Sequence, residues 1–367
     1  MDTLELFRIL VKERGSDLII KANACPAMRV DGRIKYLGES RVPEAFARAL
    51  LEQVLPEKML RKFEAEGEAD TSYEIEGIGR FRANVFLQRG RLCLVFRHVL
   101  AQVPDFKQLN LPVKQIQELA SLQRGLVLVT GMAGSGKTTT LAAMLEFMNH
   151  HFQRHIVAIE DPIEYVFTDR KSMINQREVG FDTRDFNTAL RQVVRQTPDV
   201  ILIGEMRDQE TVAGALSAAE TGHLVLSSLH TVNAVQTVER ILSFFPAHQH
   251  EQIRLELSLT LEGILSQRLL PRKNSEGRVP AVEILLGTPR IRELLYGGAT
   301  RELVKAVEEG AHYYGTQTFL QSLRDLFSRG LISIEDALAA ADNPDELKLE
   351  LRGVTRGSSV ADFDFKF

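Results

Sequence analysis

A glycine-rich segment between an apolar run and a helical pattern constrains this chain more than any other feature. Residues 126–130 are apolar or β-branched and predict a buried strand, whereas residues 139–152 space their apolar side chains as a helix does. Between them the sequence carries the pattern G-x-x-x-x-G-K-[ST], formed by Gly131, Gly136, Lys137 and Thr138. A strand, a glycine loop and a helix in this order form a cradle whose backbone N–H groups bind phosphate. The alternative, a glycine-rich turn without a ligand, does not account for the lysine, the hydroxyl and the helix together.

The pattern predicts ATP and Mg²⁺ as ligands of this segment. In such loops the lysine reaches the β- and γ-phosphates, and the hydroxyl that follows it takes a position on Mg²⁺. Lys137 is therefore a predicted catalytic residue and Thr138 a predicted metal ligand. We expect nucleotide contacts along the whole loop and the start of the helix, from Gly131, Met132, Ala133, Gly134, Ser135, Gly136, Lys137, Thr138 and Thr139.

The composition is that of a soluble globular protein, since 44% of the 367 residues are hydrophobic and 26% are charged. The net charge of −4 and the pI of about 6.2 disfavour a dedicated nucleic-acid-binding protein, which is usually basic. Cys25 and Cys93 lie too far apart for a zinc C-x-x-C pair. The first residues lack the pattern of a signal peptide, and no apolar run approaches the about 20 residues of a membrane span, so we expect a cytoplasmic protein.

The order of the predicted elements indicates two domains. Residues 1–100 predict a small α+β domain, and residues 101–112, with two prolines, predict a connector. Residues 113–342 alternate helix and strand, which is typical of an α/β domain with a largely parallel sheet. Towards the end of this domain the pattern indicates mostly helices, including one over residues 251–270. We expect residues 343–367 to form a loosely ordered tail.

Two acidic clusters follow apolar runs downstream of the glycine loop. The first contains Glu160, Asp161 and Glu164, and the second contains Glu205. In an α/β sheet, ligands bind beyond the carboxyl ends of the strands. Phosphoryl transfer also needs carboxylates to hold Mg²⁺ and to orient the attacking group. A single cluster would be interpreted as ordinary loop acids, but two clusters after a phosphate loop favour a function in the site.

Histidines and arginines complete the set of candidate residues. His223 and His230 stand on either side of a predicted strand, so they lie at its opposite ends and do not predict a metal pair. His230, at the carboxyl end, is better placed to sense a γ-phosphate. Arg82 and Arg97 on adjacent predicted strands, and Arg240 after the histidines, are candidates for stabilising the charge of the transferring phosphoryl group. Surface arginines without a function are the alternative.

Together these motifs resemble the secretion-ATPase superfamily of bacterial type II secretion and type IV pili. The resemblance covers nearly the whole chain and rests on the glycine loop and on three further motifs, at residues 160–164, 198–208 and 221–231. Within the superfamily the chain is most similar to the retraction branch, the PilT/PilU-type motors, and to the PilU type more than the PilT type. This similarity is carried by residues 125–129, 175–179 and 287–295. The resemblance implies a RecA-like P-loop NTPase core, a smaller N-terminal PAS-like α+β domain and a helical C-terminal region.

The resemblance also implies roles for residues at the matching positions. Glu164 would act as the general base or position the attacking water, and Glu205 would lie near Mg²⁺ as a metal-binding carboxylate. Arg82 and Arg97 would reach a nucleotide bound in the next subunit of a hexameric ring. The two histidines would couple the state of the nucleotide to a rotation of the domains.

The implied function is that of a homo-hexameric cytoplasmic ATPase at the inner-membrane base of the pilus machine, which drives pilus retraction and twitching motility. The implied partners are the inner-membrane platform protein of the pilus and a paralogous retraction ATPase, with no nucleic acid and no insertion into the membrane. Residues 290–295 depart from the form of the main retraction motor, which suggests an accessory motor. The alternatives are a pilus-assembly or type II secretion ATPase, a non-catalytic nucleotide-binding ring subunit and a nucleic-acid motor.

Overall fold

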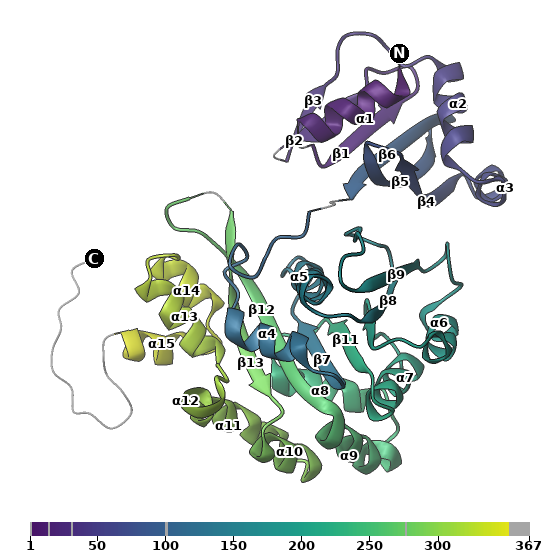
Figure 1. Ribbon diagram of the computed structural model, residues 1–367. Helices are drawn as coiled ribbons and strands as arrows, with labels where there is room; N and C mark the ends of the chain where they lie inside the picture. Colours follow the sequence, from purple (N-terminus) through teal and green to yellow (C-terminus); the bar gives the residue numbers. More distant parts are fainter. Residues whose placement is uncertain (1, 14, 31, 100–101, 276, 352–367) are drawn as a thin grey trace. The chain divides into compact units, whose positions relative to one another are not determined.

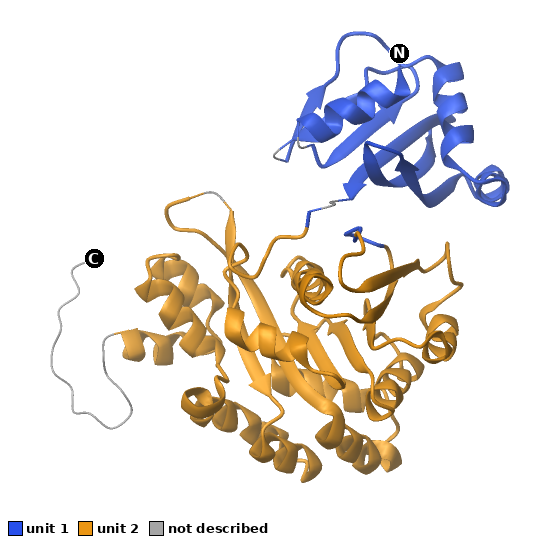
Figure 2. Cartoon of the chain, in the orientation of Figure 1, with its two compact units in different colours: residues 1–102, 163–167 blue, residues 103–162, 168–367 orange. Residues whose placement is uncertain are grey.

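The structure is a computed structural model that describes residues 2–13, 15–30, 32–99, 102–275 and 277–351. It divides into two compact units, shown in different colours in Figure 2. The first unit contains the described residues up to Gln102 together with Ile163–Phe167, and the second contains Val103–Pro162 and the described residues from Thr168 onward. The return of Ile163–Phe167 to the first unit was not predicted from the sequence, because this segment is only five residues long and carries no periodic pattern.

In the described residues, the first unit is a six-stranded antiparallel sheet with three helices. The strands lie in the order β3-β2-β1-β6-β5-β4. They are β1 (Asp17–Lys21), β2 (Ala27–Val30), β3 (Arg33–Tyr36), β4 (Glu68–Ile75), β5 (Gly79–Gln88) and β6 (Arg91–Val99). The helices are α1 (Thr3–Lys12), α2 (Glu44–Val54) and α3 (Glu57–Glu66). Each helix buries an apolar face in a core that includes residues of the sheet.

Aromatic packing marks the centre of this core. The ring of Phe7 on α1 lies 4.6 Å from the ring of Phe81 and 4.8 Å from the ring of Phe96, measured between centroids. All three side chains are fully buried. Phe81, Ala83 and Val85 of β5 share a buried face, but Leu87 at the end of the same alternation is 48% exposed. Leu87 pairs with Leu92 of β6 but lies beyond the first residue of β4, which begins opposite Phe86.

In the described residues, the second unit contains a seven-stranded sheet in the order β13-β12-β7-β11-β10-β8-β9 (Figure 1). Every neighbouring pair except β12–β13 is parallel. The strands are β7 (Gly125–Thr130), β8 (His155–Glu160), β9 (Met173–Glu178), β10 (Val200–Ile203), β11 (Leu224–Leu229), β12 (Leu261–Pro271) and β13 (Arg278–Leu286). The longer helices are α4 (Val113–Ser121), α5 (Lys137–His151), α6 (Phe186–Val193), α7 (Gln209–Glu220), α8 (Ala234–Ser243), α9 (His250–Thr260), α10 (Pro289–Tyr296), α13 (Phe319–Ser328) and α15 (Pro344–Leu351). Shorter helices are α11 (Leu303–Glu309), α12 (Ala311–Tyr314) and α14 (Ile334–Ala340).

The sheet of the second unit is covered on both faces. Leu126 and Leu128 of β7 belong to a core cluster with residues of α7, α8, α9 and α10. The intervening residues Val127 and Val129 point to the other face and are equally buried. Burial on both faces explains why β7 is apolar throughout, which is typical of a central parallel strand.

The predicted helix over residues 251–270 was wrong in its second half. The helix α9 ends at Thr260, and the chain continues directly into β12, which pairs with β7 and β13. Leu261, Ile264 and Leu265 are fully buried between these strands. An apolar run buried on both faces has no alternation that separates a strand from a buried helix, so the sequence pattern alone could not locate the hairpin.

The predicted loose tail was wrong for its first part. Pro344–Leu351 form α15, and Leu347 is fully buried in a cluster with residues of α13 and α14. A single apolar residue such as Leu347 in a short polar segment is a weak sequence signal for an ordered helix. Its importance is seen only once the residues that pack against it are known. The remainder of the predicted tail, residues 352–367, lies outside the described residues.

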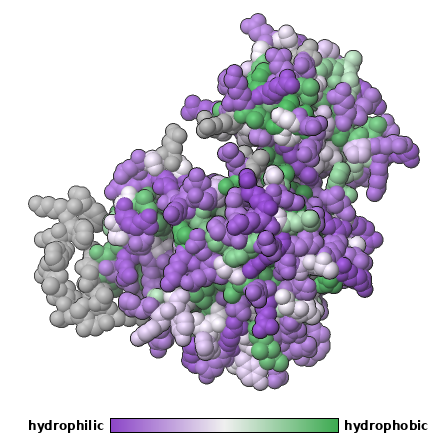
Figure 3. All heavy atoms as spheres, viewed as in Figure 1, coloured by the Kyte–Doolittle hydropathy of each residue, from purple (hydrophilic) through white to green (hydrophobic). Residues whose placement is uncertain are grey.

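Hydrophilic residues cover most of the face shown in Figure 3, and hydrophobic residues occur there in small groups. Among the described residues, no helix has the length and apolar character that a membrane crossing requires.

Candidate active site

The phosphate loop connects the carboxyl end of β7 to the amino end of α5. Gly131, Gly134 and Gly136 all have positive φ angles, of 147°, 76° and 91°. A Cβ on Gly131 would collide with the hydroxyl of Ser135 and with the carbonyl oxygen of Gln267 on β12. Glycine is therefore needed at these positions for the backbone conformation and, at Gly131, for the close approach of Ser135 and Gln267.

Two features of the loop fit a bound phosphate. A Cβ on Gly134 would meet no atom within 4 Å, so the backbone is open to a ligand at this point. The hydroxyl of Ser135 is buried and has no hydrogen-bond partner among the described residues. A buried hydroxyl without a partner is costly, and a phosphate oxygen is a suitable acceptor for it. The amino end of α5 adds the favourable dipole of a helix for an anion.

Lys137 is the first residue of α5, and its side chain is folded against the loop. Its ammonium group donates to the carbonyl oxygens of Gly131 at 2.8 Å and of Met132 at 3.1 Å. It also lies 3.5 Å from Nδ1 of His230. Only 8% of the residue is exposed, so a cation is held in a largely desolvated position beside the loop.

His230 connects this lysine to Glu205. The imidazole Nε2 lies 3.3 Å from Glu205 Oε1, while Nδ1 faces the ammonium of Lys137. Because an ammonium can only donate, Nδ1 must accept, which places the proton of the neutral ring on Nε2 and directs it to the carboxylate. The histidine therefore contacts both the lysine of the phosphate loop and the predicted metal-binding carboxylate.

Arg207 holds the other side of Glu205. Its guanidinium lies 2.9 Å from Glu205 Oε2 and 3.8 Å from Asp161 Oδ2. Hydrogen bonding to Glu205, with the charges of Glu205 and Asp161, raises the pKa of Arg207. Glu205 is 20% exposed in its side chain, which leaves it accessible to a ligand. Lys137, His230, Glu205, Arg207 and Asp161 thus form a line of contacts across the carboxyl ends of β7, β11, β10 and β8.

The residues of this line come together because parallel strands end at the same edge of a sheet. Residues 130, 229 and 203 occupy the last registered positions of β7, β11 and β10. His230 follows β11 by one position and Glu205 follows β10 by two, while the phosphate loop that ends in Lys137 begins directly after Thr130. Ligand sites in open α/β sheets lie at this edge. The sequence placed Glu205 and His230 at strand ends, and the strand order explains their contact.

A magnesium ion fits the donors at this edge. Among the described residues, no three or more His, Cys, Asp and Glu side chains gather as a metal site. Mg²⁺ does not require such a cluster, because it binds through one or two protein oxygens together with substrate phosphates and water. The hydroxyl of Thr138, exposed in the first turn of α5, and the carboxylate of Glu205 are oxygen donors of the appropriate kind.

The first acidic cluster is divided between two environments. Glu160 is buried at the end of β8, where its carboxylate accepts a hydrogen bond of 2.9 Å from the amide of Gln176. Asp161 is exposed and faces Arg207. Glu164 is exposed and belongs to the segment Ile163–Phe167 of the first unit.

Arg82 and Arg97 lie in the first unit, directly opposite each other on β5 and β6. Arg97 donates to Asp17 Oδ1 at 2.9 Å and remains 68% exposed in its side chain. Arg29 also lies 3.6 Å from Asp17. Arg82 is exposed, and no hydrogen bond or ion pair of its side chain occurs among the described residues. The three arginines and one aspartate form a cationic row across the sheet.

Two predicted residues do not meet the phosphate loop. His223 precedes β11, at the end opposite His230, and its Nδ1 contacts the carbonyl oxygen of Ala218 at 2.9 Å. Six strand residues separate the two histidines, about 20 Å of extended chain. Arg240 lies on α8 with its guanidinium 4.4 Å from the ring of Phe244. The described side-chain contacts of His223 and Arg240 are local to their own segments.

Sequence reasoning missed residues that support the loop from β12. Gln267 is 2% exposed, and its side-chain amide donates to the hydroxyl of Thr140 on α5 at 2.8 Å. Its backbone oxygen limits the space at Gly131. These contacts were hidden because the segment was assigned to a helix. Arg207 was also missed, although its position two residues after Glu205 was a usable signal.

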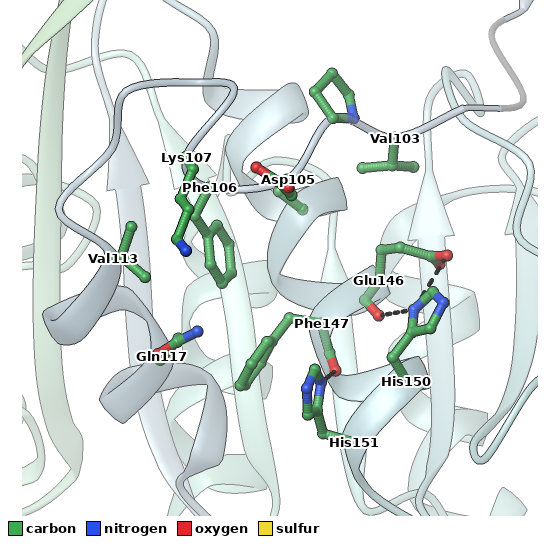
Figure 4. Close-up of a pocket in the computed structure, with 12 residues that line it drawn as sticks. Val103, Asp105, Phe106, Lys107, Val113, Gln117, Glu146, Phe147, His150 and His151 are labelled. Carbon is green, nitrogen blue, oxygen red and sulfur yellow. Dashed lines mark hydrogen bonds and ion pairs between the residues drawn. The ribbon is translucent and has the colours of Figure 1, made fainter.

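A separate cavity of about 370 Å³ lies along the second half of α5 (Figure 4). The rings of Phe106 and Phe147 meet there, with centroids 5.6 Å apart, and His151 stacks on Phe147. Glu146 pairs with His150 on the same helix. The cavity contains none of the predicted site residues and lies beyond the part of α5 that carries the phosphate loop.

Comparison with known proteins identifies the family. The model of a family described as type II/IV secretion system protein matches residues 83–336. The chain is 41% identical over 352 residues to the type IV pilus ATPase PilU of Pseudomonas aeruginosa, which covers 96% of this chain and 92% of PilU. The chain belongs to the PilT/PilU family of ATPases. Its identity to the type IV pilus retraction ATPase PilT of the same organism is also 41%, over 94% of this chain and 99% of PilT.

The fold agrees with this membership of the PilT/PilU family. The crystal structure of the pilus retraction motor PilT with bound ADP is similar with a TM-score of 0.88 and 45% identity, over 95% of this chain and 99% of that chain. The ATPase DotB of Legionella pneumophila is similar with a TM-score of 0.78 and 25% identity, over 95% of each chain. The predicted fold class and the predicted resemblance are confirmed. The chain is thus an ATP-hydrolysing enzyme of the PilT/PilU family.

Proposed function

We propose that this chain is a hexameric motor that couples hydrolysis of ATP with Mg²⁺ to type IV pilus retraction and twitching motility. The observation that carries the proposal is the line of contacts from Lys137 through His230 to Glu205, at the strand ends where the phosphate loop begins. Similarity to PilT and PilU over nearly the whole chain supports the cellular role.

Within one subunit, the residues at the sheet edge have different roles in binding phosphate, binding Mg²⁺ and sensing the nucleotide. Lys137 and the N–H groups of the loop hold the phosphates and offset their charge. Thr138 and Glu205 hold Mg²⁺, which neutralises charge on the transferring phosphoryl group when it is bound. His230 contacts both the lysine and the carboxylate, so a change at either partner alters its hydrogen bonds. His230 therefore acts as the sensor of the nucleotide state.

Glu164 acts as the general base that orients and deprotonates the attacking water. Its exposure and its place in the acidic segment after β8 support this role. Glu160 is less suitable, because its carboxylate is buried and engaged by Gln176.

Arg82 and Arg97 complete the site of a neighbouring subunit. Both are exposed, and only Arg97 has a carboxylate partner among the described residues. Two like charges on opposed strand positions repel each other, so an anion bound between them is strongly favoured. Arginines supplied from a neighbour stabilise the charge that develops in phosphoryl transfer.

The proposed setting is the cytoplasmic side of the inner membrane, at the base of the pilus machine. The proposed partners are the platform protein of the pilus and a paralogous retraction ATPase. The second partner is proposed because residues 290–295 depart from the main retraction motor, as expected for an accessory motor.

Deletion of the gene, with piliation and surface motility scored together, tests the cellular role. A retraction motor predicts many pili and reduced twitching. Cells without pili would instead indicate an assembly ATPase and contradict the proposal. Complementation with K137A separates the motor from a passive ring subunit, because only a passive subunit would restore motility without hydrolysis.

A further inference from the structure

A buried carboxylate on β13 lies behind the phosphate loop and is not part of the site described above. Glu283 is 7% exposed. Its Oε1 accepts hydrogen bonds from the backbone N–H of Ala234 at 2.7 Å and from the hydroxyl of Ser266 at 3.1 Å. Burial raises the pKa of the carboxyl group above the usual range, against the lowering effect of these two bonds. Burying a carboxyl group is costly, and hydrogen bonds to it offset part of that cost.

The first contact of Glu283 fixes the start of α8. Ala234 is the first residue of that helix and lies four positions after His230. Asn233 caps the same helix, with its side chain accepting from the N–H of Gln236 at 2.9 Å. Glu283 thus satisfies a second N–H group of the helix start, and its charge is favoured by the helix dipole. The short segment between His230 and Ala234 is held at its far end by β13.

The second contact leads to the phosphate loop. The hydroxyl of Ser266 on β12 donates to Glu283 and accepts from the hydroxyl of Thr130 at 3.1 Å. Thr130 is the last residue of β7 and directly precedes Gly131. Ser266 and Thr130 are both fully buried, so no water competes for these bonds.

The strand register places the hydrogen-bonded residues Thr130, Ser266 and Glu283 in one row across the sheet. Leu229 pairs with Thr130, Thr130 pairs with Ser266, and Ser266 pairs with Glu283. His230 directly follows Leu229 at one end of this row, and Gly131 directly follows Thr130. The hydrogen bonds thus connect Thr130 before the phosphate loop to Ser266 on β12, Ser266 to Glu283 on β13, and Glu283 to the start of α8. The start of α8 leads back along the chain to His230, which contacts Lys137 of the phosphate loop.

We propose that Glu283 is a positioning residue that holds His230 in contact with Lys137 and Glu205 by anchoring the start of α8 to the strand that carries the phosphate loop. Removal of the carboxylate leaves the N–H of Ala234 without a partner and releases the segment that follows His230. The inference rests on the proposed role of His230 as a sensor. It assigns no contact with nucleotide to Glu283 itself.

A double-mutant cycle on the full-length protein tests this coupling. E283A is expected to lower kcat about tenfold with KM changed by less than about twofold, the effect of losing the buried hydrogen bonds from Ala234 and Ser266 that act through His230. In an H230A background, E283A is expected to change kcat by less than about twofold, because its effect has already been lost. Equal effects of E283A in both backgrounds would show that Glu283 does not act through His230 and would overturn the proposal.

Two further variants keep the test decisive if E283A does not fold. E283Q retains an oxygen that accepts from Ala234 and Ser266, so it is expected to keep most of the wild-type kcat. S266A cuts the link to Thr130 and is expected to show the same non-additivity with H230A. Additive effects of S266A and H230A would overturn the proposal in the same way.

S322A is the matched control. The hydroxyl of Ser322 on α13 accepts from the N–H of Val282, the neighbour of Glu283, at 3.0 Å, and it is equally buried. S322A removes a buried hydrogen bond to the same strand without touching α8, so kcat is expected to be unchanged. Hydrogen exchange over residues 231–237 is expected to rise in E283A and not in S322A, and equal rises in both would contradict the proposal.

Failure of this inference is distinct from failure of the proposed function. If H230A hydrolyses ATP at the wild-type rate, the sensor role of His230 is wrong and the cycle shows no coupling. If H230A is slow and E283A is additive with it, the sensor role stands and the positioning role of Glu283 is wrong.

Discussion

Arg82 and Arg97 lie directly opposite each other on antiparallel strands, and of these two arginines Arg97 is the one that pairs with Asp17 in the described residues. Opposed like charges cost free energy in a sheet unless an anion offsets them. This pair is therefore suited to a ligand from outside its own unit, and the proposed ligand is the nucleotide of a neighbouring subunit.

A mixing experiment tests the arginine pair. The double variant R82A/R97A is expected to hydrolyse ATP about a thousandfold more slowly than wild type, as in other enzymes that lose a catalytic arginine supplied in trans. K137A is expected to be inactive for a different reason, because it lacks the lysine of the phosphate loop. Co-assembled rings are expected to regain activity, since intact loops of one variant then face intact arginines of the other. A mixture with only the summed activity of its parts would contradict action in trans.

Lys137 provides the direct test of the phosphate loop. Replacement by alanine removes a cation that is held within hydrogen-bond distance of two loop carbonyls. We expect ATP hydrolysis to fall by at least about a hundredfold, the usual effect of removing a preorganised charge from a reacting group. Steady-state phosphate release and binding of a fluorescent nucleotide measure the two contributions. K137A turning over ATP at the wild-type rate would exclude this loop as the site.

Variants of Gly131 and Gly134 can be compared to test how the shape of the phosphate loop depends on glycine. Both have positive φ angles, but only at Gly131 would a Cβ collide with Ser135 and Gln267. G134A is expected to cost about 1 kcal/mol of stability from backbone strain alone. G131A adds a steric clash against backbone and is expected to cost more and to abolish nucleotide binding. Thermal unfolding and nucleotide titration of both variants check this order, and equal effects would refute it.

The lowered pKa of Asp185 predicts that the stability of the fold depends on pH. It caps α6 through a hydrogen bond of 2.6 Å from the N–H of Thr188, and hydrogen bonds to Thr188 and Arg184 lower its pKa to about 2. Since the folded pKa is below the unfolded value of about 4, the cap stabilises the fold fully above that value. The stabilisation is lost as the pH falls towards about 2.

The variant D185N isolates the contribution of the Asp185 charge to stability. Asparagine caps helices as well as aspartate does but carries no charge. We therefore expect the difference in Tm between wild type and D185N to be constant above about pH 4 and to shrink towards acid. A difference that does not change with pH would show that the charge of Asp185 contributes nothing beyond the cap.

The phosphate loop and its flanking elements were predictable because every signal for them is local. Gly131, Lys137 and the apolar strand before them lie within a dozen residues and need no knowledge of the remaining fold. The contact between His230 and Glu205 was only partly predictable. The sequence places each at a strand end, but their proximity depends on β10 and β11 being neighbours, which no local pattern encodes.

The β12–β13 hairpin was not predictable, and its contacts were missed with it. Gln267 and Glu283 are buried polar residues of this hairpin, and their partners lie 127 and 49 residues away in the chain. A buried polar residue has a sequence signal only when its strand is assigned correctly. Once the hairpin is known, two buried polar groups behind a phosphate loop become obvious candidates for support of the site.

The membership of Ile163–Phe167 in the first unit means that the chain crosses between the units three times. No single cut at the connector can release either unit whole, and a fragment ending at Gln102 would lack a piece of its own body. Glu164 travels on that piece, in the same body as both arginines. A displacement of the first unit would therefore move the proposed general base Glu164 together with Arg82 and Arg97.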